Sequence, residues 1–284
     1  MATKRPILGL ALGGGVVRGM AHIGVLREFE KNNIPIDLIA GTSAGAFAGA
    51  SYAAGLSPDQ IEAAALKLRW TDLGKMTVSR LGIFNSERME TYLKNLLPVS
   101  KFEQTRMPLG VVATDIQAGK MVVFTEGDIP LAVRASCAIP CYFLPVIVNG
   151  RMMVDGGLVG HLPGAVARGM GADIVIAVDV NSQGIPIPPP TNVFSMMSQS
   201  LSIMGRSSVE YLYQDADLVI HPRVGDFAPD DMGNIAALIK TGEEAARRTM
   251  PAIKKLLARE QPGFFKRIFA KEPDGRRVKM LDRR

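Results

Sequence analysis

The chain has 284 residues, 47% of them apolar and 21% charged, a composition typical of one large globular domain or two small ones. Its net charge is +6, but residues 252–284 alone hold 11 Lys and Arg against 4 Asp and Glu, a net +7 that leaves −1 on the rest. This uneven distribution argues against a nucleic-acid-binding domain, because the binding face of such a domain should itself be basic.

Cysteines and apolar segments indicate the compartment. Cys137 and Cys141 are the only cysteines, too few for a disulfide framework or, without nearby histidines, a structural zinc site. Lys4 and Arg5 precede an apolar run, but that run leads into three glycines without a convincing signal-peptide cleavage site. No segment reaches the roughly 18 uninterrupted apolar residues of a membrane span. We therefore expect a cytoplasmic protein with reduced thiols and neither a metal nor another cofactor.

The first hundred residues alternate between continuous apolar runs, typical of buried strands, and apolar residues at helical spacing. In chain order we expect a strand at 6–12, a glycine loop at 13–19, a helix at 17–32, a strand at 36–40, a small-residue helix from 44, a helix at 57–70, an irregular segment at 71–85 and a helix at 86–97. Ser57 and Ser86 are the expected N-caps, and Pro58 fits the first helical position.

The alternation continues through the rest of the chain. We expect an antiparallel hairpin at 109–125, a helix at 129–136, an irregular segment at 138–145, a hairpin at 146–154, a helix at 163–170, a strand at 173–180, a proline-rich connector at 185–190, a helix to about 213, a strand at 216–222 and a helix at 234–259. Asn149-Gly150 is the strongest turn signal. The pattern predicts an α/β fold, a three-layer α/β/α sandwich with a mostly parallel sheet, over residues 1–260, followed by a basic tail at 261–284.

A Gly-x-Ser-x-Gly sequence joins the second strand to its helix. It consists of Gly41, Thr42, Ser43, Ala44 and Gly45. A serine at such a strand-to-helix elbow is strained, so the residues two positions away on either side must lack side chains. Its hydroxyl would lie at the positive end of a helix, where an alkoxide is stabilised. Alternatively, Ser43 merely caps a helix in a glycine-rich turn, and this pattern alone does not decide between the two.

The glycine loop at 13–19 also has two interpretations. A dinucleotide-binding fold would need an acidic residue at the end of the second strand, whereas Asp37 stands at its start. The other interpretation is an oxyanion hole, in which the amides of Gly14, Gly15 and Val16 converge on a developing negative oxygen. Because the first two strands should be parallel neighbours, this loop should lie beside Ser43. Arg18 either stabilises the loop or meets an anionic head group.

A serine nucleophile needs a base. Asp155 leaves a hairpin strand and enters Gly156-Gly157, a turn that permits close approach to another loop, and an adjacent carboxylate can accept the serine proton directly. Alternatively, Asp155 simply makes an Asx-turn. The chain also has three histidines, so a Ser-His-Asp hydrolase remains open, but only two strands precede the serine, which disfavours the α/β-hydrolase order. The three histidines are His22, His161 and His221.

Taken together, these motifs resemble the bacterial patatin-like phospholipase family over about residues 6–250. The matching segments are Gly13-Gly14-Gly15, Arg18-Gly19 with Ala21 to Leu26, Gly41 to Gly45, Arg134-Ala135-Ser136 with Pro140 and Phe143, and Asp155-Gly156-Gly157. The resemblance implies an α/β/α sandwich with Ser43 as nucleophile and Asp155 as general base. It also implies an oxyanion hole of the amides at 14, 15 and 16. Many members carry glycine at the position of Val16, whose side chain restricts the loop.

The expected activity is hydrolysis of lipid or phospholipid acyl esters through an acyl-enzyme. The alternative is a non-catalytic, lipid-binding regulator on the same fold. Segments 81–84 and 141–144 either line an acyl channel or belong to the core, and the same holds for Met196, Met197, Met204 and Tyr211. The aromatic and basic segment 263–271 either packs on the domain or contacts an anionic bilayer, which would make the protein peripheral at the inner membrane surface.

Overall fold

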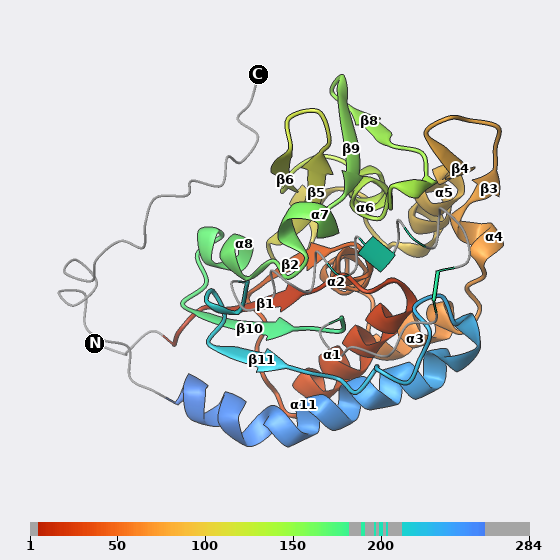
Figure 1. The fold of residues 1–284 in the computed structure, drawn as a ribbon. Coiled ribbons are helices and arrows are strands. Elements are labelled where there is room, and N and C mark those ends of the chain that lie inside the picture. Colours follow the sequence, from red (N-terminus) through yellow and green to blue (C-terminus); the bar gives the residue numbers. More distant parts are fainter. Residues whose placement is uncertain are drawn as a thin grey trace.

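A central eight-stranded sheet organises the protein in a computed structural model that describes residues 5–181, 189–190, 196, 199–200, 203 and 212–258 (Figure 1). The strand order is β11 (Leu218–Ile220), β10 (Ile174–Val178), β1 (Leu8–Leu12), β2 (Leu38–Thr42), β5 (Leu109–Asp115), β9 (Arg151–Asp155) and β8 (Val146–Val148), with β6 (Lys120–Phe124) also paired to β5. The strands from β11 to β5 are parallel, and β6, β8 and β9 run antiparallel to their neighbours.

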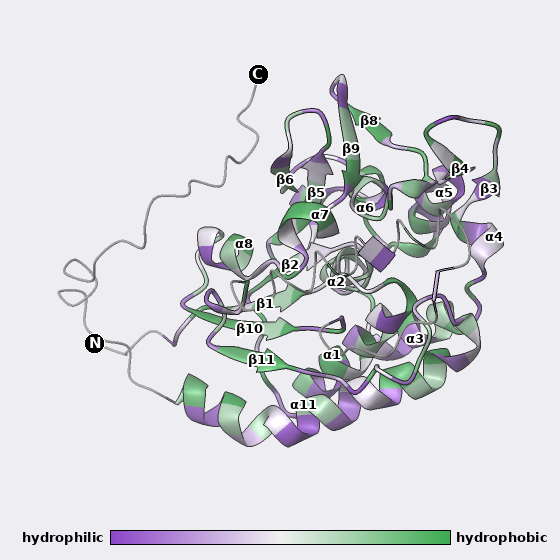
Figure 2. Cartoon of the chain, viewed as in Figure 1, coloured by the Kyte–Doolittle hydropathy of each residue, from purple (hydrophilic) through white to green (hydrophobic). Residues whose placement is uncertain are grey.

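Helices cover both faces of this sheet, because its strands are apolar on both sides. In β1, Leu8, Leu10 and Leu12 belong to the larger apolar cluster, whereas Ala11 belongs to the smaller cluster on the other face. The larger cluster includes α1 (Ala21–Lys31), α2 (Ala44–Ala53), α3 (Pro58–Ala65), α6 (Ile129–Ser136) and α11 (Ile235–Leu257). The smaller one includes α8 (Gly164–Gly169). Figure 2 shows the central strands as hydrophobic, and the predicted three-layer sandwich is confirmed.

Helix boundaries differ from the predictions in several places. The 3-10 helix η1 (Val16–Met20) precedes α1, and α3 ends at Ala65, well before the short helix α4 (Trp70–Leu73). Ser57 caps α3 as expected, since its hydroxyl accepts a hydrogen bond from the amide of Gln60 at 3.2 Å.

Ser86 occupies the predicted N-cap position of α5 (Glu87–Leu96), but its side chain does not cap the helix. The side-chain oxygen of Asn85 accepts from the amide of Glu87 at 2.9 Å, while the hydroxyl of Ser86 accepts from Arg134. Ser86 is fully buried, so its hydroxyl serves a tertiary contact with α6 rather than its own helix.

The two segments that we expected to be irregular form a second, three-stranded sheet. Its strands are β3 (Lys75–Met76), β4 (Gly82–Asn85) and β7 (Cys141–Phe143). β4 and β7 are parallel, with Gly82 paired to Cys141 and Phe84 to Phe143. Strands this short carry no periodicity, and β7 is far from β4 in the chain, so the sequence pattern did not reveal this sheet.

Several predictions lie outside the described residues. They concern most of the connector at 185–190, most of the helix that should lead to residue 213, the side chains of Met197, Met204 and Tyr211, the domain boundary at residue 260 and the basic tail at 261–284. Among the helices that the structure describes, none combines the length and the apolar character that crossing a bilayer requires.

Candidate active site

Ser43 occupies a strained elbow between β2 and α2. Its backbone has φ 52° and ψ −120°, in the left-handed region that side chains disfavour. The flanking glycines are sterically required: a Cβ at Gly41 would lie 2.6 Å from the Cα of Ala46, and one at Gly45 would lie 2.1 Å from the carbonyl oxygen of Leu12. These clashes are the reason for the Gly-x-Ser-x-Gly spacing.

The register of the sheet brings Asp155 to this elbow. Thr42, the last residue of β2, pairs with Val112 of β5, and Asp155, the last residue of β9, pairs with the next residue, Ala113. Because β6 occupies the other edge of β5, β2 and β9 meet end to end along the same edge. The hydroxyl of Ser43 donates a hydrogen bond to Oδ2 of Asp155 at 2.7 Å.

The carboxylate of Asp155 is buried and otherwise held by the turn that follows it. Its Oδ1 accepts a hydrogen bond from the amide of Gly157 at 2.7 Å, so the side chain does form the Asx-like contact while also meeting Ser43. Burial raises the pKa of Asp155 to about 6, although the hydrogen bonds from Ser43 and Gly157 lower it. At neutral pH the group is therefore mostly a carboxylate, yet more basic than an ordinary aspartate.

Ser136 connects the elbow to the turn after Asp155, a role that the sequence did not reveal. Its hydroxyl accepts from the amide of Ser43 at 2.7 Å and donates to the carbonyl of Val112 at 2.5 Å. Its own carbonyl accepts from the amide of Gly156 at 3.3 Å. Ser136 is fully buried at the end of α6, and it thereby fixes the position of Ser43 relative to Asp155.

The glycine loop lies against Ser43 as expected. A Cβ at Gly14 would be 3.4 Å from the Cβ of Ser43, and one at Gly19 would be 2.3 Å from the Cβ of Ala44. The absence of a side chain at Gly19 therefore permits the close contact with α2. Arg18 is buried and donates through Nε to the carbonyl of Phe227 at 2.9 Å, which favours the interpretation that it stabilises the loop.

The amides of the loop differ from the expected oxyanion hole in one respect. The amide of Gly13 donates to Val178 at 3.1 Å, and that of Gly14 donates to the carbonyl of His161 at 3.0 Å. Within the described residues, the amides of Gly15 and Val16 have no such acceptor. Of the three amides expected in the oxyanion hole, that of Gly14 is therefore already engaged by a protein carbonyl. Val16 has φ 52°, a conformation that strongly disfavours a β-branched residue.

In the part of the chain that the structure describes, the Ser43 hydroxyl is hydrogen-bonded to Asp155, and no hydrogen bond joins it to a histidine. His22 is buried against the carbonyl of Gly13, 2.8 Å from its Nε2, and burial lowers its pKa to about 4. His161 is buried behind the glycine loop, and His221 packs edge-on against Tyr213 with ring centroids 5.6 Å apart. The arrangement is a Ser-Asp pair rather than a Ser-His-Asp triad.

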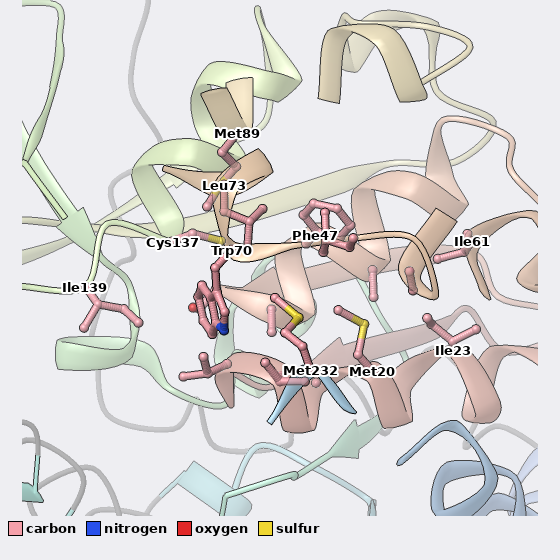
Figure 3. Close-up of a pocket in the computed structure, with 18 of the residues that line it drawn as sticks. Met20, Ile23, Phe47, Ile61, Trp70, Leu73, Met89, Cys137, Ile139 and Met232 are labelled. Atoms are coloured by element: carbon pink, nitrogen blue, oxygen red, sulfur yellow. The ribbon is translucent and has the colours of Figure 1, made fainter. Parts of the chain in front are cut away.

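An apolar pocket begins at Ser43 and extends between the helices (Figure 3). Cys137 lies at the Ser43 end, where burial first and then the charge of Asp155 raise the pKa of its thiol, so the thiol is neutral. In Figure 3, Ile139 lies near Cys137, and Ile23 and Ile61 lie at the opposite end. Of the segments 81–84 and 141–144, for which both a channel and a core role were open, only Phe143 lines this pocket.

Comparisons with known proteins support the same fold and family. The family model described as Patatin-like phospholipase matches residues 10–167, a span that includes both Ser43 and Asp155. The crystal structure of VipD from Legionella pneumophila is similar in fold, with a TM-score of 0.50 at 12% identity, covering 87% of this chain and 67% of VipD.

Two relatives in sequence are considerably longer than this chain. An uncharacterized NTE family protein of Mycobacterium tuberculosis is 38% identical over 181 residues, which are 63% of this chain and 50% of the relative. Patatin-like phospholipase domain-containing protein 7 of Rattus norvegicus is 37% identical over 186 residues, 62% of this chain and 14% of that protein. The chain thus spans about half the length of its mycobacterial relative. Because the family model matches more than half of the chain, the chain belongs to the patatin-like phospholipase family.

Proposed function

We propose that the protein hydrolyses acyl esters of lipids, with Ser43 as the nucleophile and Asp155 as the general base. The observation that carries the proposal is the 2.7 Å hydrogen bond from the Ser43 hydroxyl to the Asp155 carboxylate at the entrance of an apolar pocket. A strained serine beside a buried carboxylate suits nucleophilic attack on an ester, and an apolar pocket suits the acyl chain.

The reaction would proceed in two stages. As Oγ of Ser43 attacks the ester carbonyl, its proton passes to Oδ2 of Asp155, and the carbonyl oxygen becomes an oxyanion. The amides of Gly15 and Val16 would donate to this oxyanion, and each donor of this kind contributes on the order of 10²–10³ in rate. The protonated Asp155 then gives the proton to the departing alcohol, which leaves an acyl-enzyme.

Water completes the cycle by the same route. Asp155 takes a proton from a water molecule as it attacks the acyl-enzyme, and the second tetrahedral intermediate collapses to release the fatty acid and return the proton to Ser43. Because Asp155 must be ionised to begin each stage and its pKa is about 6, kcat/KM should fall about tenfold per pH unit below that pH.

Covalent labelling tests the proposal most directly. We expect a fluorophosphonate probe to add once to the parent protein, and Ser43→Ala to abolish both the labelling and the hydrolysis of a short-chain aryl ester. Ser57→Ala is the matched control: it removes only the N-cap of α3, so labelling and activity should remain.

Two results would contradict the proposal. Turnover that survives in Ser43→Ala would show that another residue is the nucleophile. A parent protein that binds fatty acids but neither reacts with the probe nor turns over the ester would favour the alternative, a lipid-binding regulator on the same fold.

A further inference from the structure

The hairpin formed by β3 and β4 presents apolar side chains to solvent. Met76 is 72% exposed, Val78 fully exposed and Leu81 58% exposed, all within a stretch of six residues. The hairpin is nevertheless ordered: the amide of Thr77 donates to the carbonyl of Ile83 at 2.9 Å, and Met76 pairs with Phe84. A defined loop that exposes several large apolar side chains typically marks an interaction site.

The charges on the same hairpin are exclusively basic. Lys75 and Arg80 are exposed, and residues 75–81 contain no acidic side chain. In the part of the chain that the structure describes, neither of these two cations forms an ion pair. Apolar side chains flanked by cations complement an anionic lipid surface, where the apolar groups enter the acyl region and the cations meet the phosphates.

The hairpin is continuous with the wall of the apolar pocket. Trp70 and Leu73, which line the pocket, immediately precede β3, and Phe143, which also lines it, pairs with Phe84 of β4. Trp70 is 40% exposed, so it lies at the rim rather than in the interior. Figure 1 shows the hairpin at the upper right of the molecule, directly above α4. A surface contacted by the hairpin would therefore lie close to the pocket.

We propose that residues 75–81 dock the protein on an anionic bilayer. Val78 and Leu81 enter the interface between head groups and acyl chains, and Lys75 and Arg80 contact lipid phosphates. Trp70 lies at the edge of this interface. What happens to the lipid afterwards, namely its entry into the pocket and its hydrolysis at Ser43, rests on the proposed function. The docking itself does not require turnover.

Vesicle binding by the 284-residue chain tests this proposal. The protein carries Ser43→Ala, so that no lipid is consumed, and is sedimented with phosphatidylcholine vesicles that contain or lack phosphatidylglycerol. We expect binding that requires phosphatidylglycerol and weakens with salt. Since one basic residue near an anionic surface is worth about fivefold in partitioning, Lys75→Gln with Arg80→Gln should weaken binding roughly 25-fold.

The apolar contribution is tested separately. Val78→Ser with Leu81→Ser should weaken binding by about tenfold or more, because two side chains would no longer enter the interface. The matched control is Lys240→Gln with Arg248→Gln, which removes the same charge from the exposed side of α11 and should leave binding nearly unchanged. Trp70, the only tryptophan in the chain, provides a spectroscopic signal: its emission should shift to the blue on binding in the parent and not in the hairpin variants.

The outcomes separate this inference from the proposed function. In a background with Ser43 intact, the hairpin variants should hydrolyse a soluble aryl ester like the parent, since none of the changed residues lines the pocket. The inference is overturned if the parent does not bind the vesicles, or if the hairpin variants bind as the parent does, as they would if the basic tail were the anchor. It is also overturned if Val78→Ser with Leu81→Ser instead dissociates a dimer in light scattering, because the hairpin would then contact a second copy.

Discussion

The candidate active site has a polar wall around Ser43 and Asp155 and an apolar wall that lines the pocket, and different parts of the chain form the two. The polar wall holds Ser43, Asp155 and the glycine loop, and it depends on close backbone packing. A Cβ at Gly19, Gly45 or Gly156 would lie 2.3, 2.1 and 2.3 Å, respectively, from its nearest neighbour. The apolar wall is built from the side chains of helices, with Ile23 and Ile61 at its far end. Changes in the polar wall should therefore abolish activity or folding, whereas changes in the apolar wall should alter which substrates are accepted.

The largest effect is expected at the centre of the polar wall. Asp155→Asn should lower kcat/KM for a soluble aryl ester by on the order of 10³, because the amide cannot accept the proton of Ser43. Steady-state kinetics with the parent as reference measure this loss. A loss of less than about tenfold would show that Asp155 is not the base, since a general base contributes at least about 10²-fold.

The same substitution should stabilise the fold at neutral pH. The pKa of Asp155 is about 6 in the folded protein and 3.8 ordinarily, so folding favours the protonated acid, and the free energy of unfolding falls as pH rises from about 4 to 6. Asparagine never ionises. Above pH 6, Asp155→Asn should therefore be more stable by on the order of 1–3 kcal/mol, a gain that should disappear below about pH 4. Equal stability of the two proteins at all pH values would contradict this account of the buried carboxylate.

A second test of the polar wall concerns its glycines. Gly45→Ala should destabilise the protein by about 1–3 kcal/mol or prevent folding, because the new Cβ meets the backbone of Leu12 and Gly13, which cannot move independently of the sheet. Gly169→Ala is the matched control, since a Cβ there has no neighbour within 4 Å. Thermal unfolding should show a large difference between the two variants, and similar midpoints would contradict the steric argument.

The apolar wall should respond with a change of specificity. Ile61→Ala should extend the optimal acyl chain by about two methylenes, each worth about fourfold in kcat/KM, because it opens the pocket at the end opposite to Ser43. A series of aryl esters of increasing chain length measures the shift. Ile239→Ala, a buried isoleucine of α11 that does not line the pocket, should lower stability without changing the chain-length preference.

The smallest effect is expected at Val16, where the two walls meet. Val16 lines the pocket and holds φ 52°, so Val16→Gly should relieve backbone strain and open the entrance, raising kcat/KM for branched acyl groups by about threefold. Val16→Ala removes the bulk but keeps the strained Cβ, and it should share the change of specificity. Only Val16→Gly should gain thermal stability, by less than about 1 kcal/mol. If Val16→Ala gains as much, the strain argument is wrong.

Local patterns were sufficient for the strands of the central sheet and for the elbow. Continuous apolar runs identified the strands of the central sheet, Asn149-Gly150 marked a turn in which both residues have positive φ, and the glycines around Ser43 followed from sterics within one turn of chain. Such features depend on residues only a few positions apart, so they can be predicted from the sequence directly.

The tertiary structure decided the features that depend on distant segments. Ser43 and Asp155 are 112 residues apart, and they meet because β2 and β9 end against adjacent residues of β5. The engagement of the Gly14 amide by His161, the role of Ser136 and the second sheet depend equally on distant partners. Strand register results from many weak packing contacts throughout the core, whereas sterics and apolar periodicity act within a few residues. The sequence by itself therefore determined which groups could react, and the packing of the whole domain determined which of them touch.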